Sequence, residues 1–115
     1  MIWFMSKRDL DLLLNDILEC CQKIKKYTVE DSFEDFLADE RTIDAVIRNF
    51  AIIGEATANI DPDFKIQNPQ IEWREIKDFR NKIVHDYTGI DHSIVWEIIT
   101  NFITDLEFQI QELLK

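Results

Sequence analysis

Hydrophobic residues recur at steps of three and four along most of this 115-residue chain, which is the spacing of amphipathic α-helices. The first run predicts a helix over about residues 7–26, and Ser6 stands where an N-terminal cap is needed. A second run predicts a long helix over about residues 39–60. Between them, Ser32 is placed to cap a short helical turn.

The second half of the chain predicts two more helices. Asp61 and Pro62 are expected to end the long helix and to open a loop over residues 61–69. The third helix is predicted from Pro69 or Gln70 to His85, before a break at Thr88 and Gly89. Asp91 or Ser93 then caps a last helix, whose apolar positions continue to Leu113.

These elements predict an all-α fold, an up-and-down bundle of four main helices plus a short one, in a single domain over residues 1–115. Only two glycines and two prolines are present, and this scarcity favours long helices over a sheet with many turns. Gly54 lies inside the long helix, where glycine costs about 0.5–1 kcal/mol relative to alanine. Close approach of another helix is the best explanation for it.

The formal net charge is −10, whereas a general nucleic-acid-binding protein is usually basic. The acidity argues against broad binding to a phosphate backbone and is compatible with a basic protein partner. A small phosphate site is still possible, because four cations cluster near one another in the third helix: Arg74, Lys77, Arg80 and Lys82.

Several chemistries are not indicated. Cys20 and Cys21 are adjacent, so their side chains point in different directions on a helix and predict neither an internal disulfide nor a metal site. Free cysteines are typical of a reducing cytoplasm, where we expect the protein to be located. The apolar segment 1–5 is too short to span a membrane and is expected to pack on the bundle or on a second subunit. No glycine-rich phosphate loop, carboxylate cluster or other cofactor motif is present.

The most informative segment is Arg80-x4-His85-x-Tyr87, with Asn81 directly after the arginine. Arginine offers a fixed fork of donors that suits phosphate, and histidine can accept and then donate a proton near neutral pH. This pairing suits cleavage of RNA by its own 2′-hydroxyl. Arg80 and His85 are five residues apart, about 140° around a helix, so spacing alone does not place them on one face.

The motif resembles the signature of HepT-type toxins in the HEPN superfamily of helical ribonucleases. The resemblance extends over most of the chain through flanking blocks at residues 53–56, 73–76, 89–91 and 95–97. It implies a HEPN-like fold, a homodimer with a composite cleft, and metal-independent cleavage of RNA rather than DNA. Arg80 and His85 would be catalytic, and Asn81 and Lys77 would support phosphate binding. The resemblance further implies a partner, an MntA-like nucleotidyltransferase antitoxin that silences the toxin by transferring AMP to Tyr87.

Two other interpretations remain open. The chain could be a non-catalytic helical dimer that binds a nucleotide or presents a substrate to a nucleotidyltransferase. It could also be a structural dimerisation domain in which the motif is a surface ion-pair cluster. A carboxylate paired with Arg80, together with a His85 buried away from any cleft, would favour the structural interpretation. Glu55, beside Gly54, is the acid expected to reach Arg80, more as an ion-pair partner than as a catalytic group.

Overall fold

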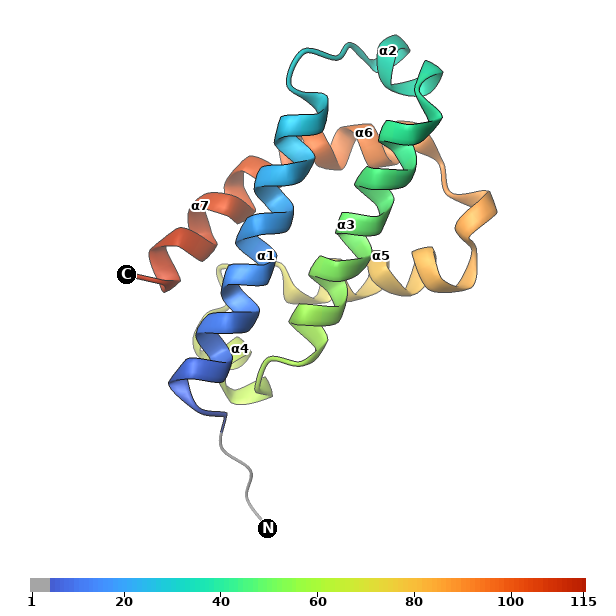
Figure 1. Ribbon diagram of the computed structural model, residues 1–115. Helices are drawn as coiled ribbons and strands as arrows, with labels where there is room; N and C mark the ends of the chain where they lie inside the picture. Colours follow the sequence, from blue (N-terminus) through green and yellow to red (C-terminus); the bar gives the residue numbers. More distant parts are fainter. Residues whose placement is uncertain (1–4) are drawn as a thin grey trace.

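The computed structural model describes residues 5–115, and every regular element in that part of the chain is helical. The all-α fold predicted from the hydrophobic spacing is therefore confirmed (Figure 1). In chain order the elements are α1 (Lys7–Thr28), α2 (Phe33–Ala38), α3 (Glu40–Ala58), α4 (Pro62–Gln67), α5 (Trp73–His85), the 3-10 turn η1 (Tyr87–Gly89), α6 (His92–Asn101) and α7 (Ile103–Leu113).

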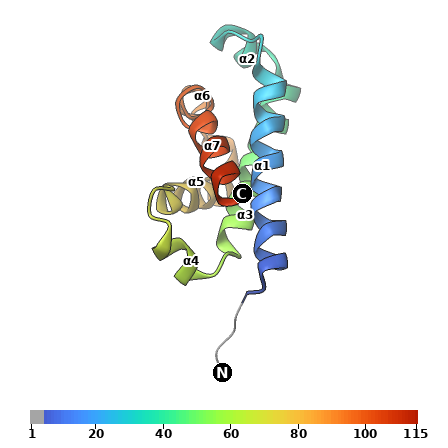
Figure 2. The ribbon, with the colours of Figure 1, turned by 90° about the vertical axis from the view of Figure 1, so that its left-hand side faces the viewer.

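The helices form two layers. The long helices α1 and α3 lie side by side and run in opposite directions, while α5, α6 and α7 lie on one side of this pair (Figures 1 and 2). Helix α7 packs on α1, and α5 packs on α3. Helix α5 crosses α3 instead of running along it, so that it is seen nearly end-on in Figure 2. One side of α3 therefore meets the helix that carries the motif.

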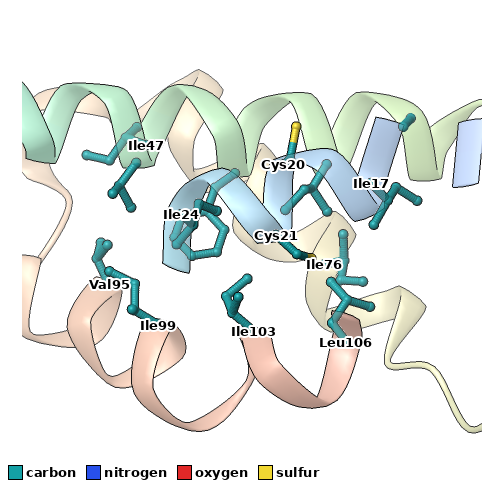
Figure 3. Close-up of a cluster of buried hydrophobic side chains, with 14 of the residues drawn as sticks. Ile17, Cys20, Cys21, Ile24, Ile47, Ile76, Val95, Ile99, Ile103 and Leu106 are labelled. Atoms are coloured by element: carbon teal, nitrogen blue, oxygen red, sulfur yellow. The ribbon is translucent and has the colours of Figure 1, made fainter. Parts of the chain in front are cut away.

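The core fills the space between the layers (Figure 3). Burial of each large aliphatic side chain contributes about 1.5–3 kcal/mol, so this cluster is the main source of stability. Most of its members come from α1, α3 and the three helices of the second layer, and Phe36 of α2 joins them. Those with 1% exposure or less include Leu14, Ile17, Cys21, Ile24, Phe36, Val46, Val95, Ile103, Leu106 and Ile110.

Side-chain caps begin several of the helices where the sequence places them. The Ser6 hydroxyl accepts a hydrogen bond from the Asp9 amide at 3.0 Å, which confirms the predicted start of α1. Ser32 caps α2 through a reciprocal pair of hydrogen bonds with Asp35. Asp91, one of the two predicted caps, accepts from the Ser93 amide at the start of α6. These bonds satisfy amides that the helices themselves leave unpaired.

Three boundaries differ from the prediction. The segment 61–69, predicted as a loop, contains α4, because proline is well tolerated in the first turn of a helix and Asp61 caps it. Helix α5 begins at Trp73 and not at residue 69 or 70. The predicted last helix is divided at Phe102 into α6 and α7. No glycine or proline marks this division, and the apolar spacing continues across it, so the pattern could not reveal it.

Gly54 holds α5 close to α3. A Cβ atom at this position would overlap the Cβ and Cγ atoms of Arg80, so only glycine allows the observed approach. The rings of Phe50 and Phe79 pack edge to face nearby, with centroids 5.2 Å apart. The prediction that Gly54 marks the close approach of another helix is confirmed, and the helix is the one that carries the motif.

The remaining predictions concern the terminus and the cysteines. Residues 1–4, expected to pack on the bundle or on a second subunit, lie outside the described part of the chain. No helix in residues 5–115 has both the length and the apolar character needed to cross a membrane.

Cys20 and Cys21 are both buried and free. Burial is the main cause that raises the pKa of Cys20 to about 11 and that of Cys21 to about 12.

Candidate functional site

The motif occupies the C-terminal half of α5 and the turn that follows. Helix α5 ends at His85, and the Asp86 amide donates a hydrogen bond to the Lys82 carbonyl at 2.9 Å to close the last turn. The chain then enters η1, whose first residue is Tyr87. The motif residues therefore lie on one helix end and one turn, and α3 is the element packed against them.

Arg80 is held by an ion pair with Glu55 of α3. Its Nε and Nη2 atoms both donate to Oε1 of Glu55, at 2.9 and 2.5 Å, and Nη1 donates to Oδ1 of Asn81 at 3.2 Å. The predicted contact between Glu55 and Arg80 is thus confirmed. Glu55 remains 56% exposed and the Arg80 side chain 29%, and ion pairs this accessible contribute about 0–1 kcal/mol. A phosphate group can therefore compete with Glu55 for this cation.

His85 is exposed, and its ring is free to contact a substrate. Among residues 5–115, its side chain forms no hydrogen bond or ion pair with Arg80. Because both residues belong to one continuous helix, they stay about 140° apart around its axis. One copy of the chain thus presents a cation and a proton-transfer group at the same helix end, on different faces.

Tyr87 points toward the N-terminal half of α3. Its hydroxyl donates a 3.0 Å hydrogen bond to Oδ1 of Asp44, and half of the residue is exposed. This hydrogen bond is the main cause that raises the pKa of Tyr87, followed by burial and by the negative charges of Asp44 and Glu40. The phenol is therefore protonated at neutral pH, and a carboxylate lies ready to receive its proton.

Two residues near the motif were missed by the sequence interpretation, Asp44 and Arg48. Asp44, Arg48 and Glu55 lie at steps of four and seven, within about 40° of one another around α3. Asp44 and Glu55 touch Tyr87 and Arg80, so Arg48 lies on the face between these contacts. It is exposed and forms no ion pair with any residue from 5 to 115. The spacing of these three residues was visible in the sequence once Glu55 had been singled out.

A cleft of about 740 Å³ opens beside Arg80 and extends toward the start of α5. Small residues of α3 line one wall, and the second predicted supporting residue, Lys77, lines the other. We refer to it as the basic cleft, after the four cations that line it: Lys65, Arg74, Lys77 and Arg80. Among the lining residues within 5–115, Asp78 is the one carboxylate. The cleft therefore carries a net positive charge, whereas the whole chain has a formal net charge of −10.

The site contains no obvious set of metal ligands. Within residues 5–115, no three His, Cys, Asp or Glu side chains gather closely enough to hold a metal ion. The groups that the motif presents are a guanidinium, an imidazole, an amide and a phenol. These groups are chemically suited to a phosphate ester, because a guanidinium can bind its oxygens and an imidazole can transfer protons near neutral pH.

A family model described as "Ribonuclease HepT-like" matches residues 17–113, which include every residue of the motif and of the basic cleft. The chain belongs to the ribonuclease HepT-like family. The predicted resemblance is therefore confirmed, and the protein is classed with ribonucleases. HepT-like sequence continues through α3, α4 and α5, so the helix that supplies Glu55 is part of the matched region.

Relatives of similar length support this assignment. A protein of Thermococcus cleftensis named "Probable ribonuclease HepT" is 42% identical over 109 residues, covering 95% of this chain and 99% of its own length. MJ0127 of Methanocaldococcus jannaschii, whose name marks it as a candidate RNase, is 38% identical over 111 residues, covering 96% of this chain and 92% of its own. No solved structure matches the chain.

Proposed function

We propose that this HepT-like protein is an endoribonuclease toxin that cleaves single strands of RNA without a metal ion. The observation that carries the proposal is the arrangement at the end of α5. Arg80 is held in place by Glu55 and Asn81, and His85 stands exposed one turn further along. Both groups suit a phosphodiester. The exposed ion pair of Arg80 with Glu55 is weak enough to let a phosphate bind the guanidinium instead.

The proposed reaction needs a cation to bind the phosphate, and it needs proton transfer at the 2′-oxygen and at the 5′-oxygen. His85 accepts the proton of the 2′-hydroxyl, whose oxygen attacks the adjacent phosphorus and forms a new bond to it. The bond from phosphorus to the 5′-oxygen breaks, and that oxygen takes up a proton from an imidazolium, so that His85 returns to its neutral form by the end of the reaction. The products are a 2′,3′-cyclic phosphate and a 5′-hydroxyl. Arg80 stabilises the charge that develops on the phosphate oxygens, while Asn81 keeps the guanidinium oriented.

A two-fold dimer would complete the site. Within one copy, Arg80 and His85 face different directions on α5. Two copies related by a two-fold axis present the same patch to each other, so the arginine of one motif can lie opposite the histidine of the other. The exposed Val84 on the same helix end offers apolar surface for such a contact. The predicted homodimer is accordingly retained as part of the proposal.

The structural interpretation of the motif has one observation in its favour, the ion pair between Arg80 and Glu55. Its second condition, a buried His85, is not met, because His85 is exposed. An ion pair that served stability alone would also leave the exposed histidine and the basic cleft without an explanation. We therefore place the ribonuclease ahead of both non-catalytic alternatives.

The proposed regulation is transfer of AMP to Tyr87 by an MntA-like nucleotidyltransferase antitoxin. The Tyr87 oxygen attacks the α-phosphorus of ATP, pyrophosphate leaves, and Asp44 is placed to receive the phenolic proton. Tyr87 is half exposed, so another enzyme can reach it. The new phosphodiester would lie near Arg48, one helical turn from Asp44, and its bulk and charge would oppose the approach of RNA.

The cleavage proposal is tested with purified protein and a single-stranded RNA in the presence of EDTA. We expect cleavage to persist and to leave 2′,3′-cyclic phosphate ends. A substrate with one deoxyribose at the cut site is the matched control, because it lacks the internal nucleophile. Equal cleavage of that control would disprove the mechanism. A wild type that cuts no RNA, yet binds nucleotides as a dimer, would favour the non-catalytic alternative.

The regulatory proposal is tested by co-expression with the cognate nucleotidyltransferase and measurement of intact mass. Wild type should gain one or more AMP units, and Tyr87→Phe should gain none. Tyr87→Phe should also remain toxic and escape neutralisation, since it retains Arg80 and His85. A wild type that is neutralised without any gain in mass would contradict this regulation while leaving the ribonuclease proposal intact.

A further inference from the structure

We propose that the basic cleft between α3, α4 and α5 binds a second phosphate of the RNA strand, next to the phosphate that is cut. This inference rests on the proposed function, because Arg80 belongs both to the motif and to the wall of the cleft. The cleft extends from Arg80 away from His85, along the first half of α5. A strand lying with one phosphate at Arg80 would therefore continue into it.

The charge of the cleft is the first argument. Four of its lining residues are cations and one is a carboxylate, in a chain whose formal net charge is −10. Among residues 5–115, neither Lys65 nor Lys77 forms an ion pair, and Arg74 forms none within that range either. Arg80 is paired with the exposed Glu55, and Asp78 also lines the cleft, so the cations exceed the carboxylates near them without being fully neutralised. Such an excess of cations on one face of an acidic protein is suited to an anionic ligand.

The ammonium groups of Lys65 and Lys77 lie close enough in the cleft to repel each other. Lys65 of α4 is half-buried, and its burial is the main cause of its lowered pKa, with the positive charge of Lys77 on α5 as the second. A phosphate between them would relieve both costs, because it would pair with each ammonium group. The position of α4, which the sequence did not reveal as a helix, is what brings Lys65 to the cleft.

Thr57 supplies an independent argument. It lines the cleft from α3, is 2% exposed, and its hydroxyl has no hydrogen-bond partner among residues 5–115. Buried polar groups in folded proteins are nearly always paired, and an unpaired one calls for an explanation. An oxygen of a bound phosphate would give this hydroxyl an acceptor, once the flexible lysine side chains rearrange around the ligand.

Trp73 favours an RNA strand over a free anion. It also lines the cleft, and its indole N–H is fixed by a 2.9 Å hydrogen bond to the Asn68 carbonyl, so the orientation of the ring is set. Aromatic rings beside a cationic groove are the usual means by which proteins hold single-stranded nucleic acids, since bases stack on them. The ring also packs in part against the hydrophobic core, so a base could stack only on the part of it that borders the cleft.

The test measures binding without cleavage. In a His85→Ala background, the affinity for a fluorescent oligoribonucleotide is recorded by anisotropy over a range of salt concentrations. For single strands, each phosphate contact contributes about 0.7 to the slope of log K against log salt. Because both lysines pair with the same phosphate, the double variant Lys65→Gln/Lys77→Gln should lower the magnitude of the slope by about 0.7, and each single variant should lower it by less. The matched control is Lys26→Gln, which replaces an exposed lysine of α1 that is not among the residues of the cleft. This variant should leave the slope unchanged.

Thr57→Val separates a ligand contact from a structural role. It removes an unpaired buried hydroxyl, so the free protein should be as stable as the parent or more so. RNA affinity should nevertheless fall by about tenfold, the loss expected when a hydrogen bond to a charged group disappears. A variant that is more stable and binds RNA equally well would overturn the role of Thr57 as a ligand contact.

The outcomes separate this inference from the proposed function. An unchanged slope for the double variant Lys65→Gln/Lys77→Gln would overturn the second phosphate site, even if the wild type cleaves RNA. If inorganic phosphate shifts the NMR signals of Lys65 while the RNA slope stays unchanged, the cleft is a site for a free anion. That result would also overturn the assignment to RNA. A wild type that cuts no RNA, but whose affinity depends on Lys65 and Lys77, would refute the ribonuclease and retain the phosphate site.

Discussion

Helices α1 and α5 are both amphipathic, but they differ in how many of their residues are buried. Along α1, six residues are buried, including Leu14, Ile17 and Ile24 at 1% exposure or less. Along α5, only Ile76 and Ile83 are buried, and much of the remaining surface carries charge. Helix α1 thus contributes mainly to the core, and the candidate chemistry is concentrated on α5.

Helix α3 belongs to both regions. One side contributes Val46 and Ile53 to the core, and another provides Asp44 and Glu55 to Tyr87 and Arg80. A change at an exposed residue of α5 should therefore alter activity with little effect on folding, and a change at a buried residue of α1 should do the opposite. Changes on α3 near Gly54 should affect both.

The largest effect is expected from the motif itself. Arg80→Ala and His85→Ala should each reduce RNA cleavage by about 10²–10⁴-fold, because each removes a group that acts on the transition state. Neither should change the thermal midpoint of unfolding by much, since His85 is exposed and Arg80 has only a surface ion pair. Initial rates and circular dichroism melts on the same samples check both statements. Full activity in either variant would remove that residue from the mechanism.

Core truncation should give the opposite result. Ile17→Ala removes a side chain with 0% exposure and should cost about 2–5 kcal/mol of unfolding free energy. Ile66→Ala, at 75% exposure, is the matched control and should change stability by less than about 0.5 kcal/mol. Denaturant titration measures both. If Ile17→Ala were as stable as the parent, the division between scaffold and site would be wrong.

Gly54→Ala should disturb both regions at once. The added methyl group would meet the Cβ and Cγ atoms of Arg80, so α5 must move away from α3 or Arg80 must change its orientation. We expect a loss of about 1–3 kcal/mol, as for other overpacked sites, together with reduced cleavage. In a helix with open space at this position, the same substitution would stabilise by about 0.5–1 kcal/mol. A stabilised and fully active variant would contradict the close approach.

Glu55→Gln should have a smaller effect that favours binding. Loss of the carboxylate should cost no more than about 1 kcal/mol of stability, because the ion pair is exposed. RNA should bind more tightly, since Arg80 no longer has to leave an anionic partner. Glu34→Gln, an exposed acid of α2, controls for the change in net charge. Weaker binding by Glu55→Gln alone would show that the carboxylate positions Arg80 for the substrate.

The smallest effect concerns the phenol. Because the hydrogen bond to Asp44 raises the pKa of Tyr87, Asp44→Asn should lower that pKa toward the ordinary value for tyrosine. Ultraviolet titration in a Tyr27→Phe background would follow Tyr87 alone, as the chain has two tyrosines. An unchanged titration curve would mean that the contact between Tyr87 and Asp44 does not persist in solution.

The hydrophobic spacing predicted most of the fold because it reports burial directly. It located α1, α2 and α3, and Gly54 correctly indicated the approach of another helix. The division at Phe102 was missed because a bend between two helices that face the same core leaves the spacing unchanged. Helix α4 was missed because Asp61 and Pro62 are equally compatible with a loop and with the first turn of a helix.

The candidate site was harder to predict, because it depends on contacts across 25 or more residues. The motif and Glu55 were identified from the sequence, but Asp44 pairs with Tyr87 only because η1 folds back toward α3. Lys65 joins the basic cleft only because α4 forms, and an unpaired hydroxyl such as that of Thr57 leaves no trace in a sequence. Local spacing was enough to predict that cations cluster on α5. The groups that surround these cations depend on tertiary packing, which the spacing does not reveal.

The buried cysteines make the molecule convenient for labelling. With pKa values of about 11 and 12, the Cys20 and Cys21 thiols are protonated at neutral pH as well as shielded from reagents. A single cysteine introduced at an exposed position of α5 that is outside the proposed dimer contact, such as Glu75→Cys, should therefore react selectively in an otherwise unaltered chain. Spin labels or fluorophores attached there would test whether two copies associate in solution, without any substitution in the core.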